Sequence, residues 1–294
     1  MLLGSPPDMV HSAPSHRTRP FAHLNTQNSL DESYFIIKII FLQYQTHKML
    51  KKIHIVDIIR LYSKIERCVF LKGITVNELF AENDSLGFGL LKTVTYPFEA
   101  LKLISDYIKK IGPTLDPRIY EQKGENIWIA KSAKVAPTAS ITGPCIIGED
   151  TEVRHCAFIR GSALVGNNCV VGNSTELKNV ILIDTVQVPH YNYVGDSVLG
   201  SHSHMGAGSI TSNVKSDKTL VVIKSGDERY ETGLKKMGAV LGDFVEVGCG
   251  SVLNPGTVIG KNSNVYPLSS VRGVVPENSI YKKAGEVALK RYEY

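Results

Sequence analysis

The sequence predicts an all-β chain whose main domain is a parallel β-helix, a coil in which short strands stack turn upon turn. The first observation is an aliphatic residue at every sixth position, for ten positions in a row. The second is a small residue two positions before most of these aliphatics. Because helices repeat at about 3.6 residues and strands at about two, neither element alone produces this period. The aliphatic positions are Ile129, Val135, Ile141, Ile147, Val153, Ile159, Val165, Val171, Leu177 and Ile183.

A period of six has a direct structural meaning. Each unit supplies one short strand and one turn, and stacked turns bury the aliphatic side chains inside the coil. After Ile183 the phase slips by four residues, so we expect Tyr193 and Leu199 to continue the inward positions, and the period resumes at Leu241. Glycines recur at the expected turns, where a positive φ or a close approach of backbones favours glycine. These are Gly148, Gly166, Gly172, Gly195, Gly200, Gly242, Gly248 and Gly260.

Composition divides the rest of the chain. Residues 1–33 are rich in Pro, Ser and His without periodicity, and we expect residues 1–48 to be a disordered or extraneous leader. Met49 has the appearance of a natural start. The remaining regions are a small mixed or helical segment at 49–125, the β-helix at 126–276 with an insertion at about 214–240, and a tail at 277–294.

The segment 49–125 carries helix signals. Thr75 with Glu78 three residues later is a capping-box pattern. Pro97 suits the first turn of a helix whose apolar face includes Leu101, Ile104 and Ile108, and Gly112 ends it. We interpret this segment as a packing element without chemistry of its own, and we expect the apolar part of the 214–240 insertion to project as a β-arm.

Composition also excludes some functions. The formal net charge is only +5 and the basic residues are scattered, which argues against a nucleic-acid partner. The five cysteines lack CxxC spacing, so neither a disulfide framework nor a zinc knuckle is expected, and no metal ligand is assigned. Cys145 and Cys169 take small inward positions and should be buried. Without about 18 consecutive apolar residues for a membrane span, we expect a soluble, cytoplasmic protein without a membrane partner.

Four segments go beyond the repeat. They are Phe158-Ile-Arg-Gly161, Glu176-Leu-Lys178, Pro189-His-Tyr-Asn-Tyr-Val-Gly-Asp196 and Gly206-Ala-Gly-Ser-Ile-Thr-Ser-Asn213. With them the chain resembles the hexapeptide-repeat acyltransferases, and in particular the acetyltransferase domain of UDP-N-acetylglucosamine pyrophosphorylase/glucosamine-1-phosphate N-acetyltransferase. The resemblance implies a left-handed coil and a homotrimer with active sites between neighbouring coils. It also implies acetyl transfer from acetyl-CoA to an amino-sugar phosphate like glucosamine 1-phosphate, in nucleotide-sugar and cell-envelope precursor synthesis.

The same resemblance assigns roles to single residues. His190 matches the general base, and Asn213 matches a group that holds the amine or the developing oxyanion. Arg160 and Lys178 match the cations that bind the sugar phosphate. The other matched positions are Tyr193, His204 and Lys218 on the substrate side, and Ala207, Cys249 and Pro267 near the coenzyme A groove.

Spacing supports the anion site independently. Lys178 follows Arg160 at an interval of three hexads, which is one full turn if a turn contains three hexads, so the two cations should stack on one face of the coil. A pair of stacked cations favours an anion site over a solvated surface. Lys215 and Lys224 are alternatives to Lys218 as a further phosphate contact.

Departures from the family keep other functions open. The family's Asn-Tyr-Asp is Asn213-Val214-Lys215 here, and His204 replaces a usual Asn. A non-catalytic trimer that binds a nucleotide sugar or a partner protein is therefore an alternative. A zinc-dependent carbonic anhydrase-like protein using His190, His202 and His204 is a further one. Residues 1–125 contain no Gly-rich phosphate loop, so we do not expect a uridylyltransferase activity.

Overall fold

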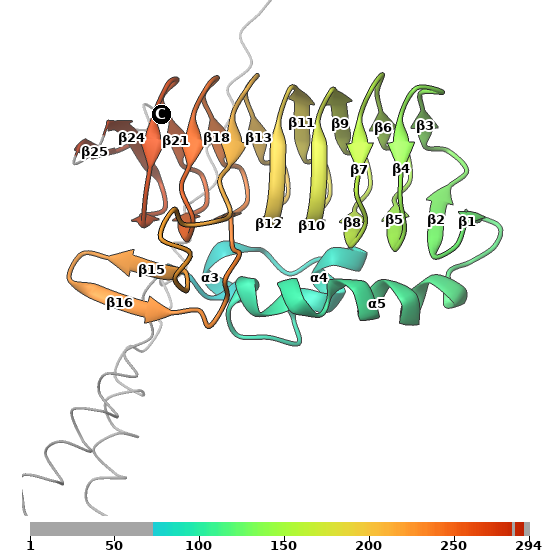
Figure 1. The fold of residues 1–294 in the computed structure, drawn as a ribbon, viewed down its shortest axis with the longest axis horizontal. Coiled ribbons are helices and arrows are strands. Elements are labelled where there is room, and N and C mark those ends of the chain that lie inside the picture. The colour runs from blue at the N-terminus through green and yellow to red at the C-terminus, as the bar shows by residue number, and fades with distance from the viewer. Residues whose placement is uncertain (1–72, 284–285, 291–294) are drawn as a thin grey trace, which may run out of the picture. The chain divides into compact units, whose positions relative to one another are not determined.

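The computed structural model of the protein describes residues 73–283 and 286–290, which fall within one compact unit, Val69–Tyr294. The expectations for residues 1–48 and for Met49 as a start lie outside the described residues. The unit is a left-handed parallel β-helix of about nine turns, as the sequence predicts (Figure 1). Strands stack in parallel on three faces, and most turns contain three hexads, so that Cys145 pairs with Ala163 in the next turn.

The three faces are defined by their strands. The first face contains β2 (Ile127–Ala130), β5 (Cys145–Ile147), β8 (Ala163–Val165), the later halves of β10 (Glu176–Leu182) and β12 (Tyr193–Leu199), β17 (Ala239–Leu241), β20 (Thr257–Ile259) and β23 (Val274–Val275). The second contains β3 (Lys134–Val135), β6 (Glu152–Val153), β9 (Val170–Asn173), β11 (Gln187–His190), β13 (His204–Met205), β18 (Glu246–Val247), β21 (Asn264–Val265) and β24 (Ser279–Lys283). The third contains β4 (Ser140–Ile141), β7 (Phe158–Ile159), the first halves of β10 and β12, β14 (Ile210–Thr211), β19 (Val252–Leu253) and β22 (Ser270–Val271).

An antiparallel strand pair covers one face of the coil at each end. β1 (Tyr120–Gly124) pairs with β2 at the start, and β25 (Glu286–Leu289) pairs with β24 at the end. These additions pair β2 and β24, which would otherwise present open sheet edges.

Most aliphatic residues of the six-residue period form the core of the coil, but Val135, in the first turn, is exposed. Ile147, Val165 and Leu253 are among those that are completely buried. The small residues occupy inner corners, where the Thr151 hydroxyl donates to the backbone carbonyl of Gly166 at 2.7 Å. Each turn therefore adds apolar side chains to one continuous core, at about 0.8 kcal/mol per buried methylene.

The structure corrects two inward positions. Ile183 and Tyr193 do not point into the coil, and Leu182 and Val194 take these places in its core. The reason is that two turns are each one residue shorter than three hexads. The pairing of Leu182 with Val165 in the turn before and with Leu199 in the turn after shows this. Because the period is six residues, two missing residues shift the inward positions in the same way as four added residues. The sequence pattern therefore could not distinguish the two cases.

The turns also differ from the expectation for glycine. None of the eight turn glycines has a positive φ, and the corners instead place residues such as Asn179 and Asp196 in the left-handed region, at φ of 55° and 48°. The glycines allow close approach between turns. A Cβ on Gly172 would lie 1.6 Å from the carbonyl oxygen of Pro189.

Short helices cover the first face of the coil (Figure 1). They are α3 (Val76–Leu79), α4 (Leu86–Leu91), the 3₁₀ helix η1 (Pro97–Lys102), α5 (Ile104–Ile111) and the 3₁₀ helix η2 (Gly112–Thr114). The capping box is confirmed, since Glu78 accepts a hydrogen bond from the Thr75 backbone N–H at 3.0 Å. The helix expected from Pro97 is divided into η1 and α5. Within residues 73–283 and 286–290, no helix has the length and hydropathy that a membrane crossing requires.

The helices bury an apolar outer surface of the coil. Ile146, Leu164 and Ile181 point away from the coil interior and are buried in one cluster with Leu101 and Ile104. The outer aliphatics of the first face are thus covered by this chain itself. They are not open to a second copy.

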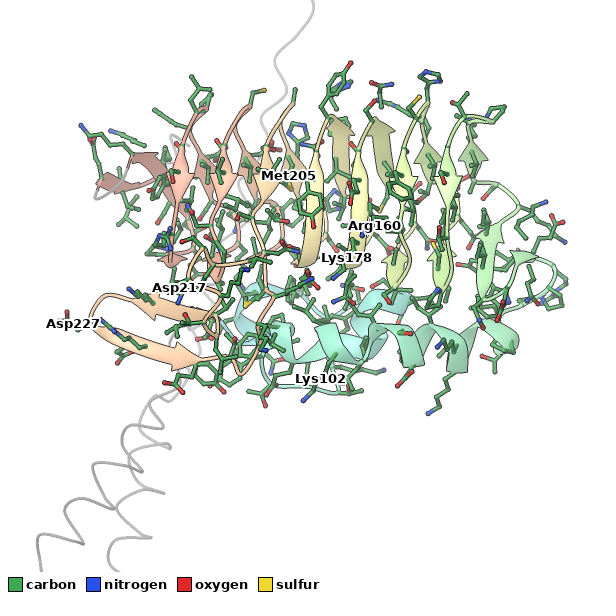
Figure 2. All side chains as sticks on the ribbon, in the orientation of Figure 1. Lys102, Arg160, Lys178, Met205, Asp217 and Asp227 are labelled. Carbon is green, nitrogen blue, oxygen red and sulfur yellow. The ribbon has the colours of Figure 1, made fainter. Side chains whose placement is uncertain are left out.

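The insertion forms a β-arm, as predicted. Its strands β15 (Val222–Ser225) and β16 (Glu228–Glu231) pair antiparallel, and Asp227 lies in the connecting turn (Figure 2). At its base, the Tyr230 ring lies 4.7 Å from the Tyr96 ring, and Val221 is buried with the helices. The arm is therefore packed against the helical segment.

Candidate functional site

The two predicted cations lie on the third face in adjacent turns (Figure 2). Residues of β7 and β10 pair in register, and the backbone N–H of Arg160 donates to the carbonyl of Leu177 at 2.8 Å. Lys178 therefore follows Arg160 one turn later. The stacking that the three-hexad interval predicts is present.

Each cation has a carboxylate partner within the chain. Arg160 Nη1 lies 2.7 Å from Glu176 Oε1, and both side chains are partly exposed. Lys178 Nζ donates to both oxygens of Asp196, at 2.9 and 3.1 Å. An anionic ligand at this face must therefore compete with Glu176 for Arg160, whereas Lys178 is held by a buried partner.

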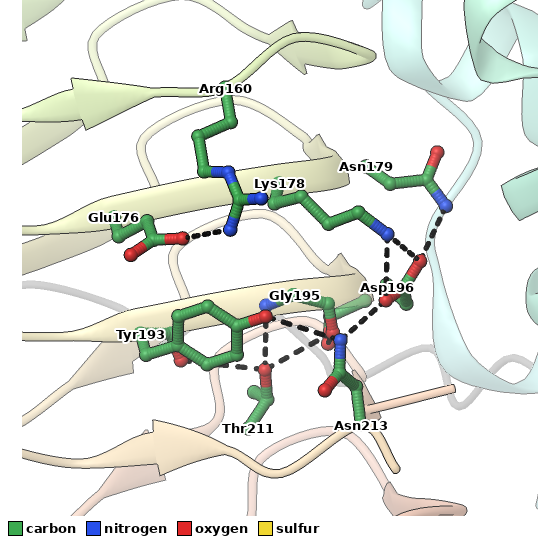
Figure 3. Close-up of polar contacts among 10 residues, drawn as sticks. Arg160, Glu176, Lys178, Asn179, Tyr193, Gly195, Asp196, Thr211 and Asn213 are labelled. Carbon is green, nitrogen blue, oxygen red and sulfur yellow. Dashed lines mark hydrogen bonds and ion pairs between the residues drawn. The ribbon is translucent and has the colours of Figure 1, made fainter. Parts of the chain in front are cut away.

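Asp196 is the centre of a hydrogen-bond cluster (Figure 3). Its side chain is 5% exposed and accepts from Lys178, from Asn179 Nδ2 at 2.9 Å, and from Asn213 Nδ2 at 2.5 Å. Its backbone carbonyl accepts from the N–H of Gly238 at 2.8 Å. Three donor groups around one carboxylate satisfy a buried charge that would otherwise be costly.

Tyr193 and Asn213 meet beside Gly195 (Figure 3). Asn213 Nδ2 donates to the Tyr193 hydroxyl at 3.2 Å. A Cβ on Gly195 would lie 2.5 Å from that hydroxyl and 2.9 Å from Asn213 Nδ2, so only glycine leaves room for this pair. Burial raises the pKa of the Tyr193 phenol, which therefore remains a neutral hydrogen-bond donor near neutral pH.

The corner between the second and third faces brings together a second set of predicted residues. Backbone hydrogen bonds connect successive turns there, from the Gly208 N–H to the His190 carbonyl at 3.0 Å and from the Gly250 N–H to the Ala207 carbonyl at 2.9 Å. One turn later the N–H of Leu268 donates to the carbonyl of Cys249. The residues that share this corner, called here the His190 corner, are His190, Ala207, Cys249 and Pro267.

A buried amide fixes the His190 corner. Asn192 is 2% exposed, and its Nδ2 donates to the carbonyls of Gly206 at 2.9 Å and Ser209 at 3.1 Å. The His190 backbone N–H in turn donates to Asn192 Oδ1 at 3.1 Å. The imidazole itself is exposed, so its ring nitrogens face solvent at a corner whose backbone is rigidly held.

Two predicted substrate residues lie elsewhere. His204 is on the second face, where its Nδ1 is 2.8 Å from Glu246 Oε2. Lys218 lies in the loop between β14 and β15, and its ammonium forms no hydrogen bond or ion pair within the described residues. The structure therefore does not bring these two residues into the group on the third face.

The cysteines fall into two classes. Cys145 and Cys169 are buried, as the sequence predicts, and burial raises the pKa of both thiols to about 12. Cys156 and Cys249 are exposed. Across residues 73–283 and 286–290, no cluster of three His, Cys, Asp or Glu side chains has the arrangement of a metal site.

Sequence reasoning missed Asp196, Glu176 and Asn192 as site residues. Asp196 ends the matched segment that starts at Pro189, and Glu176 starts the segment that ends at Lys178. The sequence indicated them only in that they lie within segments that resemble the family. Their roles depend on distances between side chains of different turns, which a sequence period does not report.

The chain matches known proteins over this same region. The sequence profile of a family described as "GMPPB C-terminal domain" matches residues 141–275. The bifunctional protein GlmU of Methanococcus vannielii is 30% identical over 160 residues, which is 54% of this chain and 34% of that protein. A bifunctional sugar-1-phosphate nucleotidylyltransferase/acetyltransferase of Sulfurisphaera tokodaii is 30% identical over 105 residues, 36% of this chain and 26% of that protein. This chain thus spans about a third or less of the length of each of these two relatives.

Solved structures match this chain at lower sequence identity. A hexapeptide transferase family protein from Anaplasma phagocytophilum is 16% identical, with a TM-score of 0.36 over 56% of this chain and 79% of that chain. At this score the superposition adds nothing to the fold that the coil itself displays. The sequence matches, together with the hexapeptide coil, support the assignment of this chain to the hexapeptide-repeat acetyltransferase domains of GlmU-like bifunctional proteins.

Proposed function

We propose that the protein is an acetyl-CoA-dependent N-acetyltransferase that acts on an amino-sugar phosphate, like glucosamine 1-phosphate. The observation that carries the proposal is the His190 corner. A solvent-facing imidazole shares one edge of the coil with the three positions assigned to the coenzyme A groove, although their spacings in the sequence differ. The named acetyltransferase activity of a relative supports the same reaction class.

The chemistry requires a base beside an amine. The amine nitrogen forms a bond to the acetyl carbonyl carbon, the carbon–sulfur bond breaks, and the thiolate leaves and takes up a proton. The amine must lose a proton in this sequence, and a histidine has a reference pKa of about 6.5, which suits a base at neutral pH. His190 fulfils this role because its imidazole is exposed on a fixed backbone.

The third face supplies the acceptor side of the site. Arg160 is the cation that an incoming phosphate can reach, since its partner Glu176 is itself partly exposed. Tyr193 lies on the third face directly after the His190 corner and contacts Asn213. These residues orient the sugar between the phosphate-binding cation and the base.

We further propose a homotrimer in the cytoplasm. The family resemblance supports this assembly, and the second and third faces are the ones that the helical segment leaves uncovered. A trimer would place a second coil against one of these faces, next to the His190 corner.

A thiol-release assay tests the proposal. Wild-type protein should release coenzyme A thiol from acetyl-CoA only in the presence of an amino-sugar phosphate. His190→Asn should reduce kcat by roughly 10²- to 10⁴-fold with little change in KM. His204→Asn is the matched control, because His204 lies on the second face with Glu246. Full activity of His190→Asn would overturn the assignment of the base.

A non-catalytic sugar-binding trimer is the second candidate. The departures from the family at Val214 and Lys215 favour it, since they remove a tyrosine and a carboxylate from the sugar side of the site. In that case the wild type binds sugar phosphates tightly but releases no thiol with any of them.

A further inference from the structure

We propose that Asp196 is a positioning residue that fixes the direction of the Asn213 amide, so that Asn213 accepts a hydrogen bond from the acceptor amine and does not donate to the oxyanion. The inference rests on the proposed function. It decides which of the two roles open to Asn213 the structure permits.

The chemistry of the carboxylate sets the direction of the amide. An ionised carboxylate only accepts hydrogen bonds. The Asn213 atom 2.5 Å from Asp196 Oδ2 is therefore the amide nitrogen. Its second N–H donates to the Tyr193 hydroxyl at 3.2 Å. Both amide hydrogens are thus used within the cluster.

The carbonyl oxygen of Asn213 is the group left for a ligand. Figure 3 shows it pointing away from Asp196. Within the described residues, no protein group donates to this oxygen. An outward carbonyl oxygen accepts from an amine N–H, whereas an oxyanion needs donors. The Tyr193 hydroxyl accepts from Asn213 and so keeps its own hydrogen for the sugar.

Asp196 is itself held in place. Its side chain is 5% exposed, and Lys178 and Asn179 occupy its remaining acceptor positions. The backbone on both sides is also fixed, because the N–H of Met237 donates to the Asn213 carbonyl at 3.0 Å and the N–H of Gly238 to that of Asp196. Asn213 therefore has little freedom to rotate while Asp196 is charged.

Asp196→Asn is the informative substitution. Asp196 has a φ of 48°, and asparagine tolerates the left-handed region well, so the backbone is unstrained. The introduced amide offers one acceptor oxygen to three donor groups and adds two donors of its own. The Asn213 amide then loses its fixed direction. Asn213→Asp has the opposite defect, because two carboxylates would face each other.

The double variant Asp196→Asn/Asn213→Asp exchanges donor and acceptor. The carboxylate at position 213 would accept from the amide at position 196 and would still present an oxygen outward. Asn179→Gly is the matched control, because it removes one Asp196 contact but leaves the Asn213 contacts intact and keeps a residue that suits its φ of 55°.

The test measures dissociation constants for glucosamine 1-phosphate and glucose 1-phosphate by calorimetry. The wild type should prefer the amino sugar. Asp196→Asn and Asn213→Asp should each reduce this preference about tenfold or more, the size of a hydrogen bond to a charged group. The double variant should restore most of it, and Asn179→Gly should leave it unchanged. Urea unfolding of the same variants without ligand should show coupling between positions 196 and 213.

The outcomes separate this inference from the proposed function. If the single variants lose stability but keep the amino-sugar preference, Asp196 is only structural and the inference fails. The same holds if the double variant is no better than the singles, or if the wild type shows no preference. A wild type that prefers the amino sugar but releases no thiol would overturn the proposed acetyl transfer and leave the role of Asp196 standing.

Discussion

Gly195→Ala tests whether the Tyr193–Asn213 pair belongs to the site. The added Cβ would lie 2.5 Å from the Tyr193 hydroxyl oxygen, 2.8 Å from its Cζ and 2.9 Å from Asn213 Nδ2. A contact of ordinary length begins at 3.4 Å, so the hydroxyl must move by at least 0.9 Å (3.4 − 2.5). The 3.2 Å hydrogen bond between the two side chains cannot survive such a shift unchanged.

The expected effect is large on activity and moderate on stability. A displacement of about 1 Å at a positioning group can cost on the order of 10²-fold in rate. Overpacking costs about 1–3 kcal/mol of stability, and here the crowded Tyr193 ring is partly exposed and can move outward, which favours the lower end. We expect kcat/KM to fall about 100-fold while the coil stays folded.

The assay is thiol release at saturating acetyl-CoA, with thermal unfolding measured alongside. Gly124→Ala is the control, because Gly124 lies in β1 and its added Cβ meets only the flexible end of Ile127, at 3.2 Å. Unchanged kcat/KM in Gly195→Ala would refute the reasoning, since the pair would then be displaced without consequence. A similar loss in Gly124→Ala would show that the effect is a general weakening of the coil.

Other expectations follow from the same contacts. Arg160→Ala should weaken glucosamine 1-phosphate binding several-fold but leave glucosamine binding unaffected. Glu176→Gln should tighten glucosamine 1-phosphate binding because it releases Arg160. Equal losses for both sugars in calorimetry of Arg160→Ala would contradict this. Iodoacetamide at pH 8 should label Cys156 and Cys249 but neither Cys145 nor Cys169, whose thiols stay protonated below about 12. Acetyl-CoA should protect Cys249 and not Cys156, and equal labelling of both would remove the His190 corner as the cofactor site. Light scattering should show a trimer at micromolar concentration, and a monomer would remove the intersubunit site.

Much of the fold follows from a local period. A six-residue repeat is visible in one sequence because each unit places its own aliphatic residue inward, and the buried Ile147 and Val165 confirm it. The stacking of Arg160 on Lys178 follows from the same arithmetic, since three hexads make one turn. Thr75, Glu78 and Gly112 mark helix ends through short-range hydrogen bonds, which are also local.

The tertiary structure alone decided how the site is assembled. Two turns are one residue shorter than three hexads. As a result Val194 points into the core, and the Tyr193 side chain lies on the outer side of the third face beside Asn213. His190, Ala207 and Cys249 share a corner although the intervals between them are unequal: a short turn separates the first two, and a turn that includes the β-arm separates the last two. No fixed period could align them. The pairing of each cation with a carboxylate and the burial of Asp196 likewise depend on side chains from different turns. The sequence by itself determined the repeat because each unit encodes its own strand. The site was decided by contacts between turns, whose register a one-residue change can shift without disturbing the hydrophobic pattern.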